Sequence, residues 1–174
     1  MQFPHNRPMA KGVALRLAVL PLLLVSFVAC SSIDCPVQTT VEVHYKVCQF
    51  EGTTVANDTL TDTLYVWTKR RDGSDTLLLN RGVNLSSFAL QISDQHPEDM
   101  LIMMVGRQTQ VRTLDTVWIE KEDIPHFESV DCAAHFFHKL TAVRSTHRAI
   151  DSIAINNPSV TYDADATNIY ISFK

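Results

Sequence analysis

Beyond residue 40 the hydrophobic and polar positions alternate in short runs, with the period of two expected of strands that bury one face. The first run divides into two faces, one with Val41, Val43, Tyr45 and Val47 and the other with Glu42, His44, Lys46 and Cys48. Further β-branched and aromatic runs occupy 63–69, 76–79, 88–92, 101–105, 111–120, 136–143, 150–155, 160–162 and 169–173. No run carries a convincing apolar stripe of period 3.6, so the pattern predicts an all-β protein.

Turn signals separate these runs at fairly regular spacing. Asp72-Gly73 stands between 63–69 and 76–79, and Asp-Gly between two such runs is typical of a β-hairpin. Many short strands with such turns predict one antiparallel β-sandwich, immunoglobulin-like or Greek-key, with about seven to nine strands over residues 41–174. The alternation places these residues in its core: Val43, Tyr45, Leu64, Val66, Leu78, Leu101, Trp118, Ile153, Ile169 and Ile171.

The first 29 residues have a different pattern. Arg7, Lys11 and Arg16 form a basic leader, and residues 17–29 then run without a charge. A membrane-spanning helix needs about 20 apolar residues, and this run is shorter and contains Pro21. A basic region, a short apolar region and a small residue at its end predict a signal peptide over 1–29.

Cys30 follows Ala29 directly, as the lipidated cysteine of a bacterial lipoprotein follows its cleavage site. We therefore expect acyl chains on Cys30, a short tether over 30–40 and an outer-membrane location. The leader has three basic residues and no acidic ones, so its removal leaves 145 residues and changes the formal net charge from −4 to −7. That charge argues against binding to nucleic acid or to anionic lipid headgroups, which attract clustered Lys and Arg.

Lipidation of Cys30 leaves three cysteines for an oxidising compartment: Cys35, Cys48 and Cys132. One disulfide can form among them in three ways, with one thiol left over. Cys48 shares a strand face with Glu42 and Lys46, so we expect it to point outward. The prediction is therefore a Cys35–Cys132 disulfide.

Several segments together resemble a known family. They are residues 125–132 (PHFESVDC), 136–138 (FFH), 149–153 (AIDSI) and 168–173 (NIYISF), with Cys30 and Cys35-Pro36 near the start. This set is similar to a family of uncharacterised lipoproteins from Bacteroidota, a domain of unknown function. The resemblance covers essentially the whole mature chain. It implies an envelope lipoprotein and supplies no activity, cofactor or catalytic residue.

Bacteroidota attach O-glycans to exported proteins where Asp precedes Ser or Thr and then a small or aliphatic residue. Five positions fit this pattern and are candidate acceptors: Thr59, Thr63, Thr76, Thr116 and Ser152. The structural alternative is that Asp closes a turn and the next residue opens a strand, a pairing that turn chemistry favours by itself.

The remaining polar and aromatic residues do not form a convincing catalytic or metal-binding pattern. Four histidines with Cys132 lack a convincing zinc-ligand pattern, and residues 163–174 lack the Gly and Glu of a calcium loop. Trp67 and Trp118 fit a core or sheet face better than a sugar-stacking platform. We expect no catalytic residue, no metal and no cofactor. The prediction is a non-enzymatic envelope module that binds a protein or glycan partner, and the alternative is a glycan or peptide hydrolase that uses Glu120 or His126.

Overall fold

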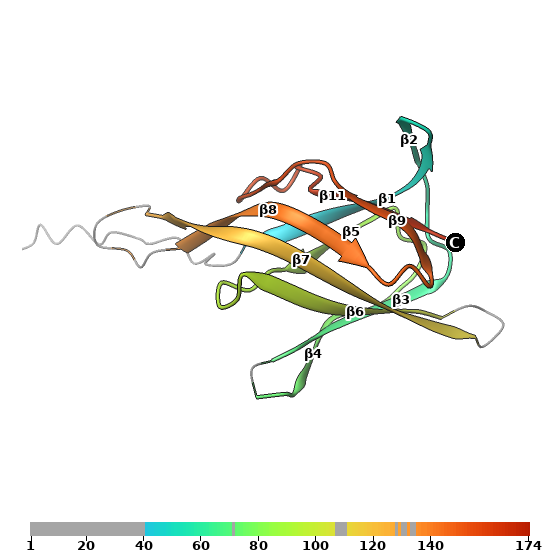
Figure 1. The fold of residues 1–174 in the computed structure, drawn as a ribbon, viewed down its shortest axis with the longest axis horizontal. Coiled ribbons are helices and arrows are strands. Elements are labelled where there is room, and N and C mark those ends of the chain that lie inside the picture. Colours follow the sequence, from blue (N-terminus) through green and yellow to red (C-terminus); the bar gives the residue numbers. More distant parts are fainter. Residues whose placement is uncertain (1–40, 71, 107–110, 128, 130–131, 133–134) are drawn as a thin grey trace, which may run out of the picture. The chain divides into compact units, whose positions relative to one another are not determined.

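The computed structural model describes residues 41–70, 72–106, 111–127, 129, 132 and 135–174. Its described part is all-β and folds as a sandwich of two sheets, as predicted (Figure 1). It contains these strands: β1 (Glu42–Glu51), β2 (Thr54–Asn57), β3 (Thr63–Lys69), β4 (Asp75–Gly82), β5 (Ser87–Gln91), β6 (Glu98–Gly106), β7 (Arg112–His126), β8 (His135–Ser145), β9 (Ile150–Ile155), β10 (Ser159–Val160) and β11 (Ile169–Phe173).

The smaller of the two described sheets has the order β2-β1-β11-β9, with β5 also paired to β1. The larger has the order β10-β8-β7-β6-β3-β4. The pairs are antiparallel except β1 with β11, which run parallel and place Tyr45 beside Ile169. The prediction of a purely antiparallel sandwich is therefore wrong for this one pair of strands. The first and last strands are far apart in the chain, so no hairpin turn constrains their direction.

Asn168 stabilises the start of that parallel pair through hydrogen bonds and is almost completely buried. Its side-chain oxygen accepts a hydrogen bond from His44 N, and its amide nitrogen donates to the carbonyl oxygens of Asn157 and Ser159. Its backbone N–H donates to the carbonyl oxygen of His44. One side chain thus ties β1 to the segment between β9 and β11 without leaving a buried amide group unpaired.

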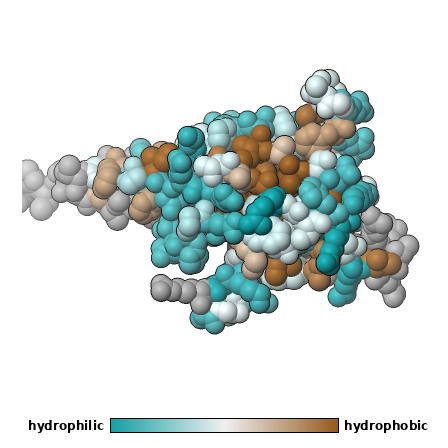
Figure 2. Space-filling view, viewed as in Figure 1, coloured by the Kyte–Doolittle hydropathy of each residue, from teal (hydrophilic) through white to brown (hydrophobic). Residues whose placement is uncertain are grey.

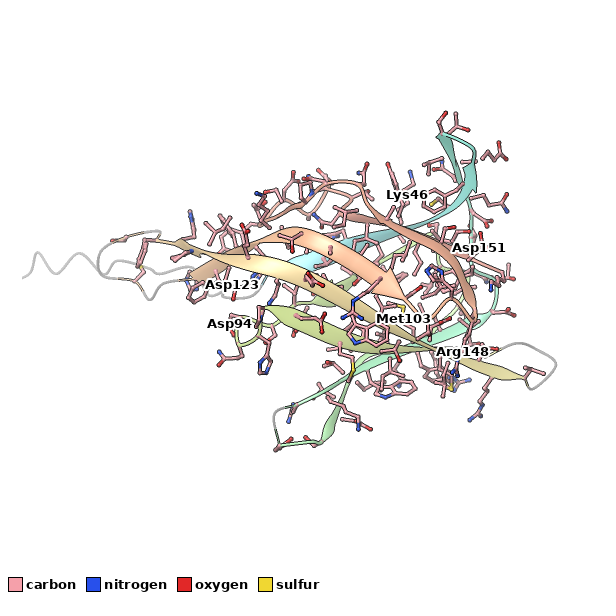
Figure 3. All side chains as sticks on the ribbon, viewed as in Figure 1. Lys46, Asp94, Met103, Asp123, Arg148 and Asp151 are labelled. Carbon is pink, nitrogen blue, oxygen red and sulfur yellow. The ribbon has the colours of Figure 1, made fainter. Side chains whose placement is uncertain are left out.

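The core lies between the sheets and contains most of the residues predicted for it. Val43, Tyr45, Leu64, Val66, Leu101, Ile169 and Ile171 are buried, and Leu78 and Ile153 are partly buried against them. Met103, labelled in Figure 3, also lies in this core and is 1% exposed. Full burial of one such aliphatic side chain contributes about 1.5–3 kcal/mol.

Trp118 does not belong to the core, contrary to the prediction. On β7 the buried positions are Val117 and Ile119, so alternation turns Trp118 to the outer face, where it is half-buried. The guanidinium carbon of Arg144 lies 4.4 Å from the centre of its ring. The strand is apolar on both faces around this point, so hydrophobicity alone did not show which residues face the core.

The prediction that Cys48 points outward is also wrong. Cys48 is 0% exposed and carries a free thiol. It follows buried Val47 directly, so the strict alternation of β1 breaks where the strand leaves β11 and begins to pair with β2. Its Sγ lies 3.7 Å from the carbonyl oxygen of Ile171, and burial raises the pKa of the thiol.

The described part has eleven strands, more than the seven to nine predicted. The main omission is β2, in a polar segment expected to be a turn. β2 pairs with the end of β1 through a tight hairpin in which Gly52 has φ of 64°, a conformation that favours glycine. Its hydrophobic pattern is weak because most of its side chains are exposed. The hairpin predicted at Asp72-Gly73 is confirmed as the link between β3 and β4.

Candidate functional site

The outer surface of the larger sheet carries an unusual number of apolar and aromatic side chains. On its central strands every second residue faces the core, as Leu64, Leu101 and Val117 do. The residues between them therefore face outward. We call these outward residues the apolar face: Tyr65, Trp67, Leu77, Met100, Ile102, Met104, Leu114 and Trp118.

Strand register makes the apolar face continuous across β4, β3, β6 and β7. Trp67 lies between Leu77 and Ile102 on its two neighbouring strands. Met104 lies between Tyr65 on β3 and Leu114 on β7. Neighbouring strands are about 4.8 Å apart, so these side chains contact one another across the sheet.

The apolar face is accessible, and charged groups border it on the β8 side. Leu77 is 53% exposed and Leu114 is 45% exposed. Next to Trp118, Arg144 donates to Glu98 Oε2 at 2.5 Å and lies 4.0 Å from Glu120 Oε1. A wide apolar patch with a charged rim is the composition of a protein-docking surface.

A cluster of polar groups consists of Lys121, Asp99, Asp123 and His138, of which Lys121 and His138 are buried and Asp123 is partly exposed. We call it the ionic cluster. The ammonium of Lys121 is fully buried, lies 3.5 Å from a carboxylate oxygen of both Asp99 and Asp123, and donates to the carbonyl oxygen of His96. Nδ1 of His138 lies 2.7 Å from Oδ1 of Asp123, which Figure 3 labels on β7.

A cleft of about 410 Å³ adjoins the ionic cluster and is lined in part by Ser93, His96 and Asp99. Burial raises the pKa of Asp99, and the Lys121 ammonium and the Ser93 N–H oppose that rise. Each member of the ionic cluster contacts another member. The arrangement therefore fits a structural ion cluster better than a poised catalytic pair.

Asp115 makes a second polar centre, at the link between β8 and β9. It is 1% exposed and accepts hydrogen bonds from Thr146 Oγ1 at 2.5 Å, Arg148 N at 2.8 Å, Ala149 N at 2.6 Å and Ile150 N at 2.9 Å. Burial alone would raise its pKa, but these donors outweigh burial and lower it. These hydrogen bonds therefore favour the ionised form of the Asp115 carboxyl.

The five candidate glycosylation acceptors lie in different settings. Thr59 is exposed in the loop after β2, whereas Thr63, Thr116 and Ser152 are half-buried in strands. The hydroxyl oxygen of Thr76 is buried without a hydrogen-bond partner, which makes it the poorest acceptor of the five. All five stay predictions. Thr63 opens β3, as the structural alternative expected, whereas β4 already begins at Asp75 and both Thr116 and Ser152 lie inside strands.

The other predicted site residues are not brought together. Residues 1–29, Cys30, the rest of 30–40 and Cys35 lie outside the described residues, so the signal peptide, the lipidation and the Cys35–Cys132 disulfide stay predictions. Glu120 lies on the rim of the apolar face, and His126 stacks on Phe137 with ring centres 4.2 Å apart. Among the described residues, no group of three or more His, Cys, Asp or Glu side chains is placed to hold a metal ion.

Neither the apolar face nor the ionic cluster was predicted from the sequence. The signal for the first was present, because the runs at 63–69, 101–105 and 111–120 are apolar at both parities. The signal for the second is Lys121, which continues the buried series Val117 and Ile119 in step with the strand period.

Within the described part of the chain, no helix is long and apolar enough to cross a membrane. A family model, described as a family of unknown function (DUF6452), matches residues 63–173. That range runs from the start of β3 to the end of β11 and includes the apolar face, the ionic cluster and Asp115. No curated protein and no solved structure matches the chain significantly.

Proposed function

This chain belongs to the family of unknown function DUF6452, and we propose from its geometry that it is a lipid-anchored, non-enzymatic binding module of the cell envelope. In this proposal Cys30 carries the acyl chains, and the apolar face binds a protein partner at the outer membrane. The observation that carries the proposal is the apolar face itself. Exposed apolar area of this extent on one sheet is typical of a surface that another molecule covers.

Two features favour a protein partner over a glycan. Aliphatic and thioether side chains make up most of the apolar face, and Met100, Ile102 and Met104 occupy its centre. Such side chains adapt to a protein surface and offer no ring for a sugar to stack on. Of the two indoles, that of Trp118 is already covered on one side of its ring by the Arg144 guanidinium, and that of Trp67 lies between Leu77 and Ile102.

Site-specific photocrosslinking in intact cells tests the docking surface. A photoreactive residue in place of exposed Leu114 is expected to give a discrete adduct with one envelope protein. Val55 is the matched control, because it is a similarly exposed aliphatic residue (41% against 45%) on the β2 hairpin. The adduct at Leu114 should be lost when Met104→Glu places a charge in the apolar face. Equal adducts from Leu114 and Val55, or an adduct that survives Met104→Glu, would contradict this assignment.

The lipid anchor has its own test. Cys30→Ser keeps the basic leader and the apolar run intact, so the chain should still be exported. It should then accumulate unprocessed or be released in soluble form, because acyl chains provide the predicted attachment. Fractionation and intact-mass measurement distinguish these outcomes. If the variant remains in the membrane at the mature mass of the parent, the anchor is something else.

The hydrolase alternative has no support from the two residues named for it. Glu120 pairs with Arg144 on the rim of the apolar face, and His126 takes part in aromatic stacking six residues further along β7. Neither lines the cleft beside Asp99. The binding module is therefore the function we propose.

A further inference from the structure

Strand β9 is at one edge of the smaller sheet. Within the described residues, no strand pairs with the side of β9 that faces away from β11. β9 pairs with β11 on one side, with Ile155 beside Ile169 and Ile153 beside Ile171. Ile153 and Ile155 also pack partly against the core from this edge. Figure 2 shows brown, apolar residues near the middle of the face in view, in the region between β8 and β9.

Hydrogen-bond parity shows which backbone groups of β9 point away from β11. Asn156 N donates to Asn168 O, so the even-numbered residues of β9 face β11. The carbonyl oxygen of Ile171 faces Cys48 on β1, so the odd-numbered residues of β11 direct their backbone groups toward β1. The even-numbered residues of β11 therefore face β9, where they pair with the even-numbered residues of β9. The N–H and C=O groups of Ile153 and Ile155 therefore point outward from the sheet edge.

The later part of the β9 edge lacks the usual protection against pairing, because Ser152 to Ile155 includes no charge and no proline. The register shift of the β9–β11 pair, charged Asp151 and the contact of the Asp151 carbonyl oxygen with His147 Nδ1 at 3.0 Å all lie before Ser152. By contrast, the edge strand β4 has register shifts and Arg81 at a φ of 53°, and β10 is only two residues long. Natural sheets protect long edges by such devices because an open edge pairs with any suitable strand.

We infer that β9 pairs with β9 of a second copy of this chain, antiparallel about a twofold axis at Ala154. This register places Ile153 opposite Ile155 of the second copy, so their outward N–H and C=O groups bond to each other. Ile153 and Ile155 of the two copies then cover each other beside the core. The only charged residue of β9, Asp151, falls opposite Asn157 of the second copy, so no like charges meet. A twofold interface of this kind is self-complementary.

Disulfide trapping in intact cells tests this register with the full chain. The axis places the two Ala154 residues opposite each other in a pair without direct hydrogen bonds, at a Cα separation of about 4.5 Å. That separation is within the range of a disulfide. Ala154→Cys should therefore give a covalent dimer of two identical chains upon mild oxidation.

Asn156→Cys is the matched control, because Asn156 follows β9 directly, is two residues from Ala154 and is more exposed. In the proposed register the two copies of residue 156 are about 13 Å apart, so no disulfide should form. A further variant, Ile153→Pro with Ala154→Cys, removes one outward N–H that β11 does not use. It should reduce the dimer yield at least severalfold while the chain accumulates normally.

The inference would be overturned by the absence of a dimer with Ala154→Cys, by equal dimer from Asn156→Cys, or by a disulfide to a different protein. The intact mass of the trapped dimer gives one more check, because a glycan on Ser152 would cover this edge. A trapped species that carries such a glycan contradicts the pairing. None of these outcomes depends on the apolar face, which lies on the other sheet.

Discussion

Replacement of Asp115 by alanine is expected to destabilise the protein by about 3–5 kcal/mol. Its carboxylate accepts hydrogen bonds from three successive backbone N–H groups, those of Arg148, Ala149 and Ile150, and from the Thr146 hydroxyl. Alanine would leave these donors without a partner at a buried site. Each unpaired buried donor costs about 1–3 kcal/mol, and partial rearrangement of the link between β8 and β9 limits the total.

Equilibrium denaturation in urea measures this loss as a lower transition midpoint. Asp151→Ala is the control, because Asp151 is an exposed aspartate on β9 and should change the unfolding free energy by less than about 0.5 kcal/mol. Asp115→Asn, which retains one acceptor oxygen, should fall between the two. A loss at Asp115→Ala no larger than that at Asp151→Ala would show that water replaces the carboxylate without penalty.

The same carboxylate gives the protein a pH dependence. The folded pKa of Asp115 is below its unfolded value of about 3.9. Its contribution to stability is therefore fully present above the unfolded pKa and is lost as pH falls through the folded pKa. The difference in unfolding free energy between the parent and Asp115→Asn should shrink below about pH 4. A difference that is constant from pH 7 to pH 3 would contradict this origin.

The fold was predictable because most strands alternate clearly and stand between turn signals. The β3–β4 hairpin shows why, since Asp72 accepts hydrogen bonds from both the N–H and the hydroxyl of Ser74, and Gly73 adopts a positive φ. These are local effects that a short segment determines by itself. The parallel pairing of β1 with β11 depends on contacts between distant residues, and no local pattern contains it.

The candidate site was harder to predict because its residues interrupt the simple pattern. Trp118 and Ile119 are both apolar, and hydrophobicity alone does not say which of them faces the core. Lys121 is a charged residue at a core-facing position, and its partner Asp99 comes from another strand. Only the pairing of β6 with β7 brings the two together. Sequence position and residue type therefore indicated the all-β fold without locating the apolar face or the ionic cluster.

Lys121→Met is expected to destabilise the protein by about 3–5 kcal/mol, because it removes the cation from a buried ion cluster. The substitution nearly conserves volume, so the loss reports charge rather than a cavity. Asp99 and Asp123 would lose the ammonium that lies 3.5 Å from each, and Asp99 is mostly buried. The control is Lys69→Met, which breaks an exposed ion pair with Asp75 and should cost about 0–1 kcal/mol.

The electrostatic origin of this loss predicts its rescue. Burial already raises the pKa of Asp99, and removal of Lys121 raises it further. A carboxyl whose folded pKa exceeds its unfolded value contributes stability below the unfolded pKa and loses it as pH rises through the folded pKa. The deficit of Lys121→Met should therefore shrink as pH falls toward about 4, near the unfolded pKa of aspartate. Asp99→Asn combined with Lys121→Met should recover much of the deficit at pH 7. Stability that is restored neither at low pH nor by Asp99→Asn would mean that the loss comes from packing or from the hydrogen bond between Lys121 and the His96 carbonyl oxygen. In that case the ionic cluster does not stabilise the fold through its charges.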